Sequence, residues 1–220
     1  MPPTDQLAGT RTRLLVAARD EFAAHGMGGA RVGRIAERAG VSKERIYGYF
    51  GSKEKLFAAV VSEALTEHAT LLGPPSGDPA EYAGRIYDLH RRNPQLLRLM
   101  MWEALYYDGG GLPNEQPRGA HYRDMVATLE DTLGTESDSE AASTLLALIG
   151  LAILPTAFPQ ITRLILGPAA DGADVADASG DGTDDDTGDD TADDTDDLRA
   201  HIVQLARRMV SSPSGPSTPG

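Results

Sequence analysis

The segment of residues 31–57, RVGRIAERAGVSKERIYGYFGSKEKLF, constrains the fold of this chain more than any other part of it. Two short amphipathic helical patterns flank a turn at Gly40, a residue that can take the backbone conformation a tight turn needs. Ser42 stands where it can cap the second helix. These features are typical of a helix-turn-helix unit. We expect the first helix of the unit to bury its apolar residues, Val32, Ile35 and Ala36.

The second helix of this unit is expected to lie on the surface. Ile46 and Phe50 have the spacing of core-packing positions, so we assign them no DNA contact. The other side chains of this helix can then point outward, and most of them are charged or phenolic. Such a helix is a candidate for entering the major groove of DNA.

The net charge of −13 looks unsuited to a protein that binds nucleic acid, but this charge is unevenly distributed. Residues 169–197 contain thirteen Asp and no basic residue, so this stretch accounts for the whole net charge. Residues 1–57 carry ten Arg or Lys against six Asp or Glu, which gives a net charge of +4. The positive charge therefore lies on the candidate DNA-reading segment.

A chain of 220 residues, of which 40% are hydrophobic, can hold one large domain or two small ones. It contains no Cys, which excludes disulfides, thiolate metal sites and cysteine nucleophiles. Its N-terminal residues lack the apolar core of a signal peptide. We therefore expect a cytoplasmic protein, which would be associated with the nucleoid when bound to DNA.

Apolar periodicity predicts an all-α fold. The first helix is expected over residues 11–25, ending at Gly26. Ser52 can cap another helix that runs to about Leu72. The Gly- and Pro-rich run at residues 73–79 then predicts a loop before a second helical region. Further helices are expected over residues 80–92, 94–107, 117–133, 138–166 and 198–210, with a deformation at Pro155 and Pro159.

Two stretches in the C-terminal half have an unusual composition. Residues 141–162 contain no charge, which is about the length of a membrane span. A helix that is apolar all round is as easily buried in a soluble core or interface, and the two prolines with no basic flanking loop favour this alternative. Residues 169–197 are low-complexity Asp, Gly, Ala and Thr. Because they have too little apolar surface to fold, we expect a disordered insert.

Residues 11–57 resemble the DNA-binding domain of the tetracycline-repressor (TetR) family of bacterial transcription regulators. The resemblance rests on many positions in the order and spacing of the family, and no single short motif carries it. These positions are Ala17-Ala18, Phe22, Gly26, Val32, Ile35-Ala36, Ala39-Gly40-Val41-Ser42, Ile46-Tyr47, Tyr49-Phe50, Ser52-Lys53-Glu54 and Leu56-Phe57.

The resemblance implies a particular division of the chain. Residues 1–57 would form a three-helix helix-turn-helix DNA-binding domain. Residues 58–210 would form a larger helical domain for effector binding and dimerisation, with the acidic disordered insert at 169–197. Residues 211–220 would form a disordered tail.

Two positions depart from the family pattern. Many relatives have Thr or Ser where Arg31 stands, and that hydroxyl caps the first helix of the unit and contacts a phosphate. In this chain the cap is lost or shifted, although Arg31 could itself reach a phosphate. Gly48 stands on the second helix where relatives often carry a bulkier residue, and it lowers helix propensity by roughly 1 kcal/mol relative to Ala. Gly48 could permit close approach of the backbone to DNA.

The chemistry of the side chains suggests how they would contact DNA. Lys43 and Arg45 can donate to guanine edges or phosphates, and phenolic side chains can reach phosphates or thymine methyl groups. Lys53 at a helix N-terminus adds to a natural anion site. We expect Arg45→Ala to damage binding far more than Arg118→Ala. The full set of expected DNA contacts is Arg31, Ser42, Lys43, Glu44, Arg45, Tyr47, Gly48, Tyr49 and Lys53.

The C-terminal half resembles the family mainly in its helical architecture. In the family the last two helices of each protomer pair into a four-helix dimer interface, which would use the apolar surface of residues 141–162 and 198–210. An effector cavity would lie among the intervening helices, although aromatic and Met side chains at helical spacing are more often core residues. The expected effector-contact residues are Met101, Trp102, Tyr106, His121, Tyr122, Met125 and Phe158.

The sequence offers no basis for catalysis or for a cofactor. The five His residues lack metal-ligand spacing, and the Asp-rich stretch lacks the terminal Glu of a calcium-binding loop. The resemblance implies a ligand-responsive repressor that binds a palindromic double-stranded DNA operator as a homodimer. A helical adaptor that does not bind DNA and a small helical enzyme that transforms a ligand remain the alternatives.

Overall fold

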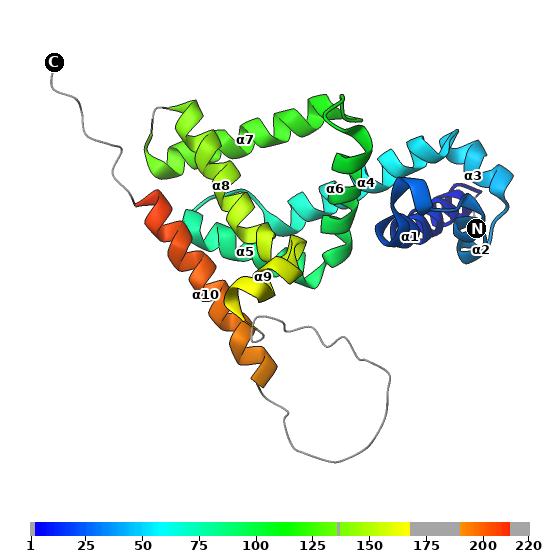
Figure 1. Cartoon of the computed structure of the whole chain (residues 1–220). Coiled ribbons are helices and arrows are strands. Elements are labelled where there is room, and N and C mark those ends of the chain that lie inside the picture. Colours follow the sequence, from blue (N-terminus) through cyan, green and yellow to red (C-terminus); the bar gives the residue numbers. More distant parts are fainter. Residues whose placement is uncertain (1–2, 136, 168–189, 212–220) are drawn as a thin grey trace, which may run out of the picture. The chain divides into compact units, whose positions relative to one another are not determined.

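The computed structural model describes residues 3–135, 137–167 and 190–211. These residues form ten α-helices (Figure 1), which confirms the predicted all-α fold. The helices are α1 (Pro3–Gly29), α2 (Val32–Ala39), α3 (Lys43–Phe50), α4 (Lys53–Leu72), α5 (Pro79–Arg92), α6 (Pro94–Tyr107), α7 (Glu115–Leu133), α8 (Asp138–Ala157), α9 (Pro159–Leu166) and α10 (Asp190–Val210).

The helices divide between two compact units. The first unit comprises residues 1–73 and 92–121, and the second comprises residues 74–91 and 122–220. The first unit therefore contains α1 to α4 together with α6, whereas α5, α8, α9 and α10 belong to the second. Residues of α7 contribute to both units.

The core of the first unit is built by α1, α2, α4 and α6, with α3 packed at its edge. Leu14, Ala18 and Phe22 recur every four residues along α1, and all three are fully buried. The ring of Phe22 meets that of Phe57 of α4 edge-on, at a centroid distance of 5.0 Å. Ile35 of α2, Ile46 of α3 and Leu99 of α6 complete the same core. The two helices of the helix-turn-helix unit thus pack against longer helices, α2 against α1 and α3 against α4.

Helix α1 begins earlier than residue 11, and its helical structure does not stop at Gly26. Gly26 has φ 62° and ψ −174°, a conformation that interrupts the helix and that side chains with a Cβ rarely adopt. Three more helical residues follow it before α2. The predicted break is therefore confirmed as a kink within α1.

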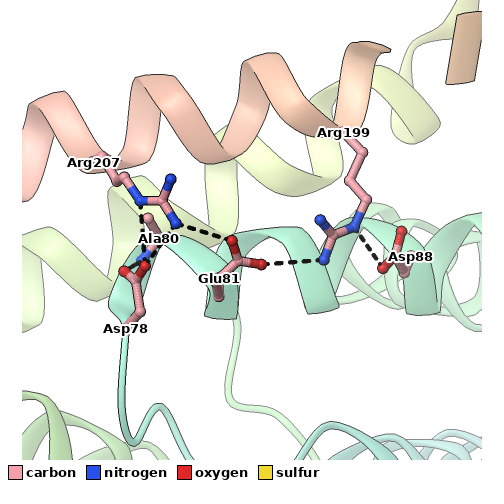
Figure 2. Close-up of polar contacts among 6 residues, drawn as sticks. All are labelled: Asp78, Ala80, Glu81, Asp88, Arg199 and Arg207. Atoms are coloured by element: carbon pink, nitrogen blue, oxygen red, sulfur yellow. Dashed lines mark hydrogen bonds and ion pairs between the residues drawn. The ribbon is translucent and has the colours of Figure 1, made fainter. Parts of the chain in front are cut away.

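In the second unit two arginines of α10 bind carboxylates at α5 (Figure 2). Arg199 binds Asp88 at 2.8 Å and Glu81 at 3.3 Å, and Arg207 binds Glu81 and Asp78 at 3.0 Å each. Gly84 of α5 lies beneath this contact, where an added Cβ would come within 2.9 Å of both Arg199 and Val203. The small residue on α5 therefore lets the two helices approach closely.

The single helix expected over residues 138–166 is in fact two helices. Phe158 has φ −131° and ψ 62°, so the helical conformation ends there and restarts as α9 at Pro159. The residue before a proline is disfavoured in the helical region, and proline itself suits the first position of a new helix. Pro155, the other expected site of deformation, lies inside α8.

Helix α8 is apolar and largely uncovered. Among the described residues it is the one helix long and apolar enough to cross a membrane, with a mean hydropathy of 1.6. Only 22% of its most apolar window is buried within this chain. Large apolar side chains are exposed on α8, on α9 and on α10. They are Leu146, Leu154, Phe158 between α8 and α9, Ile161, Leu164, Ile165, Leu166, Leu205 and Met209.

Helix α10 begins at Asp190, eight residues before its expected start at Leu198. The end of the acidic stretch is therefore helical, contrary to the expectation of disorder over the whole of 169–197. The rest of the expected insert, residues 169–189, and the expected tail beyond residue 211 lie outside the described residues.

Candidate DNA interface

The N-terminus of α2 is held by a carboxylate from α1. Arg31 is the N-cap residue, and its side chain makes no capping hydrogen bond. Its backbone N–H donates instead to Glu21 Oε1 at 2.7 Å, and Arg34 Nε donates to the same oxygen at 2.8 Å. In a capping box a Glu at the third helical position reaches back to this N–H, whereas here Arg34 holds that position and binds the carboxylate. The expected shift of the cap is confirmed, and a contact between helices replaces the missing hydroxyl.

Glu21 is only 2% exposed, yet it remains an anion. Burial acts to raise its pKa, but the hydrogen bond from Arg34, the backbone N–H of Arg31 and the positive charge of Arg34 together lower this pKa below the ordinary value. The carboxylate therefore provides a charged anchor between α1 and α2.

The turn between α2 and α3 has the geometry expected from its sequence. Gly40 adopts a left-handed conformation with φ 66°, and its N–H closes the end of α2. Ser42 then accepts a hydrogen bond from the backbone N–H of Arg45 at 3.3 Å, which caps α3. The predicted roles of Gly40 and Ser42 are confirmed.

Helix α3 presents one polar face to solvent. Ile46 is buried in the core of the DNA-binding head, the name used here for residues 1–57, and Phe50, one turn later, packs against the same core. Because successive residues are rotated by about 100° around a helix, Glu44 and Gly48 lie on the opposite side. The five residues of α3 that are exposed are Lys43, Glu44, Arg45, Tyr47 and Gly48.

Individual positions on this face differ in how they are held. The side chain of Lys43 runs over α2, because a Cβ added to Gly33 would lie 3.0 Å from Lys43 Cε. A Cβ added to Gly48 would meet no atom within 4 Å, so its surroundings are open. Tyr49 is half-buried, and its hydroxyl lies in the interior with no hydrogen-bond partner among the residues that the structure describes. A DNA contact through the Tyr49 hydroxyl would therefore require this side chain to move.

The tripeptide Ser-Lys-Glu occurs at the start of both α3 and α4, at residues 42–44 and 52–54. Ser52 accepts from the backbone N–H of Lys55 at 3.1 Å, as Ser42 does at α3. A hydrogen bond from the Ser52 side chain lowers the pKa of the Glu54 carboxyl group. The pKa of the Glu44 carboxyl group is also lowered, by a hydrogen bond from the backbone of Glu44 and a second from the Ser42 side chain. Both helices thus begin with a capped end that carries an adjacent lysine, Lys43 or Lys53.

The basic residues of the head fall into two groups. Arg34 and Arg38 bind Glu21 and Asp20, and these ion pairs join α2 to α1. The exposed cations of the expected DNA set are Arg31, Lys43 and Arg45, while Lys53 is half-buried. Arg11, near the N-terminus of α1, is a further exposed cation close to α3. Its guanidinium group lies 5.9 Å from the ring centroid of Phe50 at the end of α3.

The expected effector-contact residues are not gathered at one place. Trp102 and Tyr106 lie on the face of α6 that meets α1 and α4, where Trp102 donates to the Ala23 carbonyl and Tyr106 meets Phe57. Met101 and His121 belong to the same unit, whereas Tyr122, Met125 and Phe158 belong to the other. Met125 is buried and Phe158 is exposed at the break between α8 and α9.

A hollow of about 700 Å³ lies on the first unit. It is open to solvent along α4, and its nine lining residues include Arg11, Glu63 and Asn114. None of these nine residues belongs to the expected effector set. The hollow therefore gives no support to those seven assignments.

Sequence reasoning missed the buried carboxylates. Glu103 of α6 is only 4% exposed, and it binds Arg118 of α7 through two hydrogen bonds of 3.0 and 2.9 Å. Arg118 is therefore more than an ordinary surface charge. Glu21 gives a signal in the sequence, since it falls beside Phe22 on the buried side of α1, but nothing local identifies the partner of Glu103.

Comparison with known proteins agrees with this geometry. The family profile of the bacterial regulatory proteins of the tetR family matches residues 14–60, and that of the tetracyclin repressor-like C-terminal domain matches residues 78–178. The HTH-type transcriptional repressor SCO4008 of Streptomyces coelicolor is 36% identical over 168 residues, which span 75% of this chain and 88% of that protein. The HTH-type transcriptional repressor NicS of Pseudomonas putida is 32% identical over 104 residues, which span 44% and 49%.

A solved structure extends the similarity over nearly the whole chain. The crystal structure of the Streptomyces coelicolor protein SCO4942 aligns with a TM-score of 0.67 and 31% identity, covering 91% of this chain and 97% of that one. Proteins of this family are transcriptional regulators and not enzymes, so the hypotheses of a helical enzyme and of an adaptor that does not bind DNA are set aside. The chain belongs to the TetR family and is a DNA-binding helix-turn-helix transcriptional regulator.

Proposed function

We propose that this regulator is a repressor that binds a palindromic operator as a homodimer and leaves it when a small effector binds. The observation that carries the proposal is the outward face of α3, which combines a capped N-terminus with exposed Lys43, Arg45 and Tyr47. A helix of this kind reads base edges in the major groove. Repression is supported by the similarity to SCO4008, which is a repressor.

The contacts with DNA would be divided between bases and backbone. Lys43, Glu44, Arg45, Tyr47 and Gly48 would face the bases. The residues at the helix starts, Arg31, Ser42 and Lys53, would bind phosphates, since helix N-termini favour anions. Tyr49 would contribute only after its side chain moves. We keep residues 1–57 as the proposed DNA-binding domain, followed by the effector and dimerisation domain at 58–210 and the tail at 211–220.

A second copy of the chain would cover the apolar surface of α8, α9 and α10. Leu146 is 72% exposed and Leu164 is 84% exposed, which is unusual for leucines that recur along three neighbouring helices. Burying such a surface between two identical copies is the common way to form a C2 dimer. This role accounts for the apolar length of α8 without a membrane, and we infer a soluble protein in the cytoplasm.

The effector would be a small molecule bound by the C-terminal domain. Met101, Trp102, Tyr106, His121, Tyr122, Met125 and Phe158 remain the proposed contacts. An effector releases DNA only by binding the two conformations of the regulator with different affinity. Its binding would therefore favour a conformation in which the two heads no longer fit adjacent major grooves.

The experiment that tests this proposal is selection from random DNA. The full-length protein should enrich an inverted repeat whose half-sites are about 10 base pairs apart or a multiple of this, because two heads bind successive turns of one groove. Lys43→Ala/Tyr47→Ala should abolish enrichment, whereas Arg91→Ala, which removes an exposed charge from α5, should not. A protein that enriches no sequence, or one that sediments as a monomer when bound, would contradict the proposal.

A further inference from the structure

The kink in α1 is occupied by an indole ring from α6. A Cβ placed on Gly26 would lie 2.6 Å from Cδ2 and Cε3 of Trp102, so this ring rests directly on the glycine backbone. Trp102 Nε1 also donates to the carbonyl oxygen of Ala23 at 3.3 Å. Trp102 remains 36% exposed, so the contact is made by one face and one edge of the ring and not by complete burial. The position of α6 on α1 is thereby specified at one point.

The same end of α1 carries the contacts that hold α2. Glu21 binds the backbone N–H of Arg31 and the side chain of Arg34, as described above. Asp20 Oδ2 accepts from Arg38 at 2.7 Å. The carbonyl of Gly26 accepts from the N–H of the residue just before Arg31, Ala30, at 3.1 Å. Residues 20–26 are therefore the frame on which α2 is oriented.

A second contact from α6 reaches this frame. Gln95 Nε2 donates to Asp20 Oδ1 at 3.1 Å, while the other oxygen of the same carboxylate binds Arg38 of α2. Gln95 and Trp102 are seven residues apart, which places them two turns apart on one face of α6. Buried Leu99 lies between them on this face. One carboxylate thus connects α6, α1 and α2 through hydrogen bonds.

We propose that Trp102 and Gln95 are positioning residues for DNA reading: through residues 20–26 of α1 they let α6 set the orientation of α2, and hence of α3. Packed interfaces with hydrogen bonds at both ends hold discrete arrangements and do not slide continuously. The inference rests on the proposed role of α3 as the reading helix. It gives Trp102 a role that does not depend on contact with an effector.

A change in orientation has a particular signature. Contacts with base edges need α3 to be placed accurately, whereas attraction between basic side chains and phosphates depends mainly on charge. Loss of the positioning contacts should weaken binding to the correct sequence far more than binding to unrelated DNA. A merely structural role would lower the melting temperature and affect both kinds of binding alike.

The test uses the full-length chain and the DNA that the unaltered protein selects from a random pool. Trp102→Ala should lower affinity for this DNA by about tenfold, the loss expected when one base contact is misplaced, while affinity for unrelated DNA of equal length stays within about twofold. Trp102→Phe should recover part of the loss, because it keeps an aromatic face without the N–H donor. Gln95→Ala should give a smaller selective loss, and Leu105→Ala, an exposed position on α6, should give none.

All titrations are made well below the melting temperature of each variant, and Trp102→Phe and Gln95→Ala carry the test if Trp102→Ala does not fold. Equal losses of affinity for selected and unrelated DNA, or unchanged affinity in both Trp102→Phe and Gln95→Ala, would overturn the positioning role of Trp102 and Gln95. Neither outcome would affect the proposed reading role of α3. If the unaltered protein selects no sequence, the reading role of α3 fails, and the inference falls with it. Selective losses in the stated order support it.

Discussion

The arginine–carboxylate pairs of the two units differ in how deeply the most buried carboxylates lie. In the first unit Glu21 is 2% exposed and Glu103 is 4% exposed, although the pairs Arg38–Asp20 and Arg19–Glu67 of the same unit are partly exposed. In the second unit the side chains of Glu81 and Asp78 are 41% and 40% exposed where they meet the arginines of α10 (Figure 2). Water can replace an arginine in the second case but cannot reach the carboxylate in the first. Pairs with similar distances should therefore differ widely in how much they stabilise the fold.

Removing the partner of Glu103 should have the largest effect. Arg118→Ala leaves a buried carboxylate without its cation, which costs about 3–5 kcal/mol. Urea unfolding of the full-length protein should show this loss as a much lower midpoint. Arg123→Ala, an exposed change on the same helix, should leave the midpoint nearly unchanged. Arg118→Ala, which we expected from sequence to be mild, is thus unsuitable as a neutral control for DNA binding.

Changing Glu21 should have an intermediate and pH-dependent effect. Glu21→Ala should lower the free energy of unfolding by about 2–3 kcal/mol near pH 7, because α2 loses its cap and its ion pair. The pKa of Glu21 is lower in the folded head than its ordinary value of 4.5. The stabilisation by the charged form is therefore present above pH 4.5 and is lost as the pH falls through the lower folded pKa.

The difference in the free energy of unfolding between the unaltered protein and Glu21→Ala should accordingly shrink in acid. Thermal unfolding between pH 7 and pH 3 measures this difference. Glu21→Gln should behave similarly at low pH but retain part of the cap at neutral pH. Glu37→Ala removes an exposed carboxylate from α2 and serves as the matched control. A difference that stays constant with pH would contradict the assigned role of the Glu21 charge.

The smallest effect is expected in the second unit. Arg199→Ala removes contacts with Asp88 and Glu81, but these side chains are partly solvated, so the loss should be about 1 kcal/mol or less. Addition of salt should reduce this loss further, since partly exposed pairs are screened. A loss as large as that of Arg118→Ala would show that exposure of the carboxylate does not decide how much such a pair stabilises the fold.

Local patterns could be predicted from the sequence, and long-range partners could not. The turn at Gly40 and the caps at Ser42 and Ser52 are correct because each depends on residues at most four positions apart. The exposed set on α3 follows from the same short periodicity. These elements make up most of the candidate DNA-binding face.

The missed features join distant positions. Trp102 and Ala23 are 79 residues apart, and Gln95 and Asp20 are 75 apart, so no window of sequence contains both partners. The sequence predicts only a deformation at Pro155 and Pro159, which stand four residues apart and look alike in sequence. The structure has a complete break before Pro159, whereas Pro155 lies inside α8. A single charged residue such as Glu103 looks alike in sequence whether it is buried or solvated.

The anchoring of α10 also bears on protein engineering. Among the described residues, the ion pairs that Arg199 and Arg207 make with α5 and with Asp78 before it lie well beyond the first residue of α10 at Asp190. Shortening α10 from its C-terminal end would therefore remove the contacts of Arg207 before those of Arg199, so a truncation series can separate the two anchors.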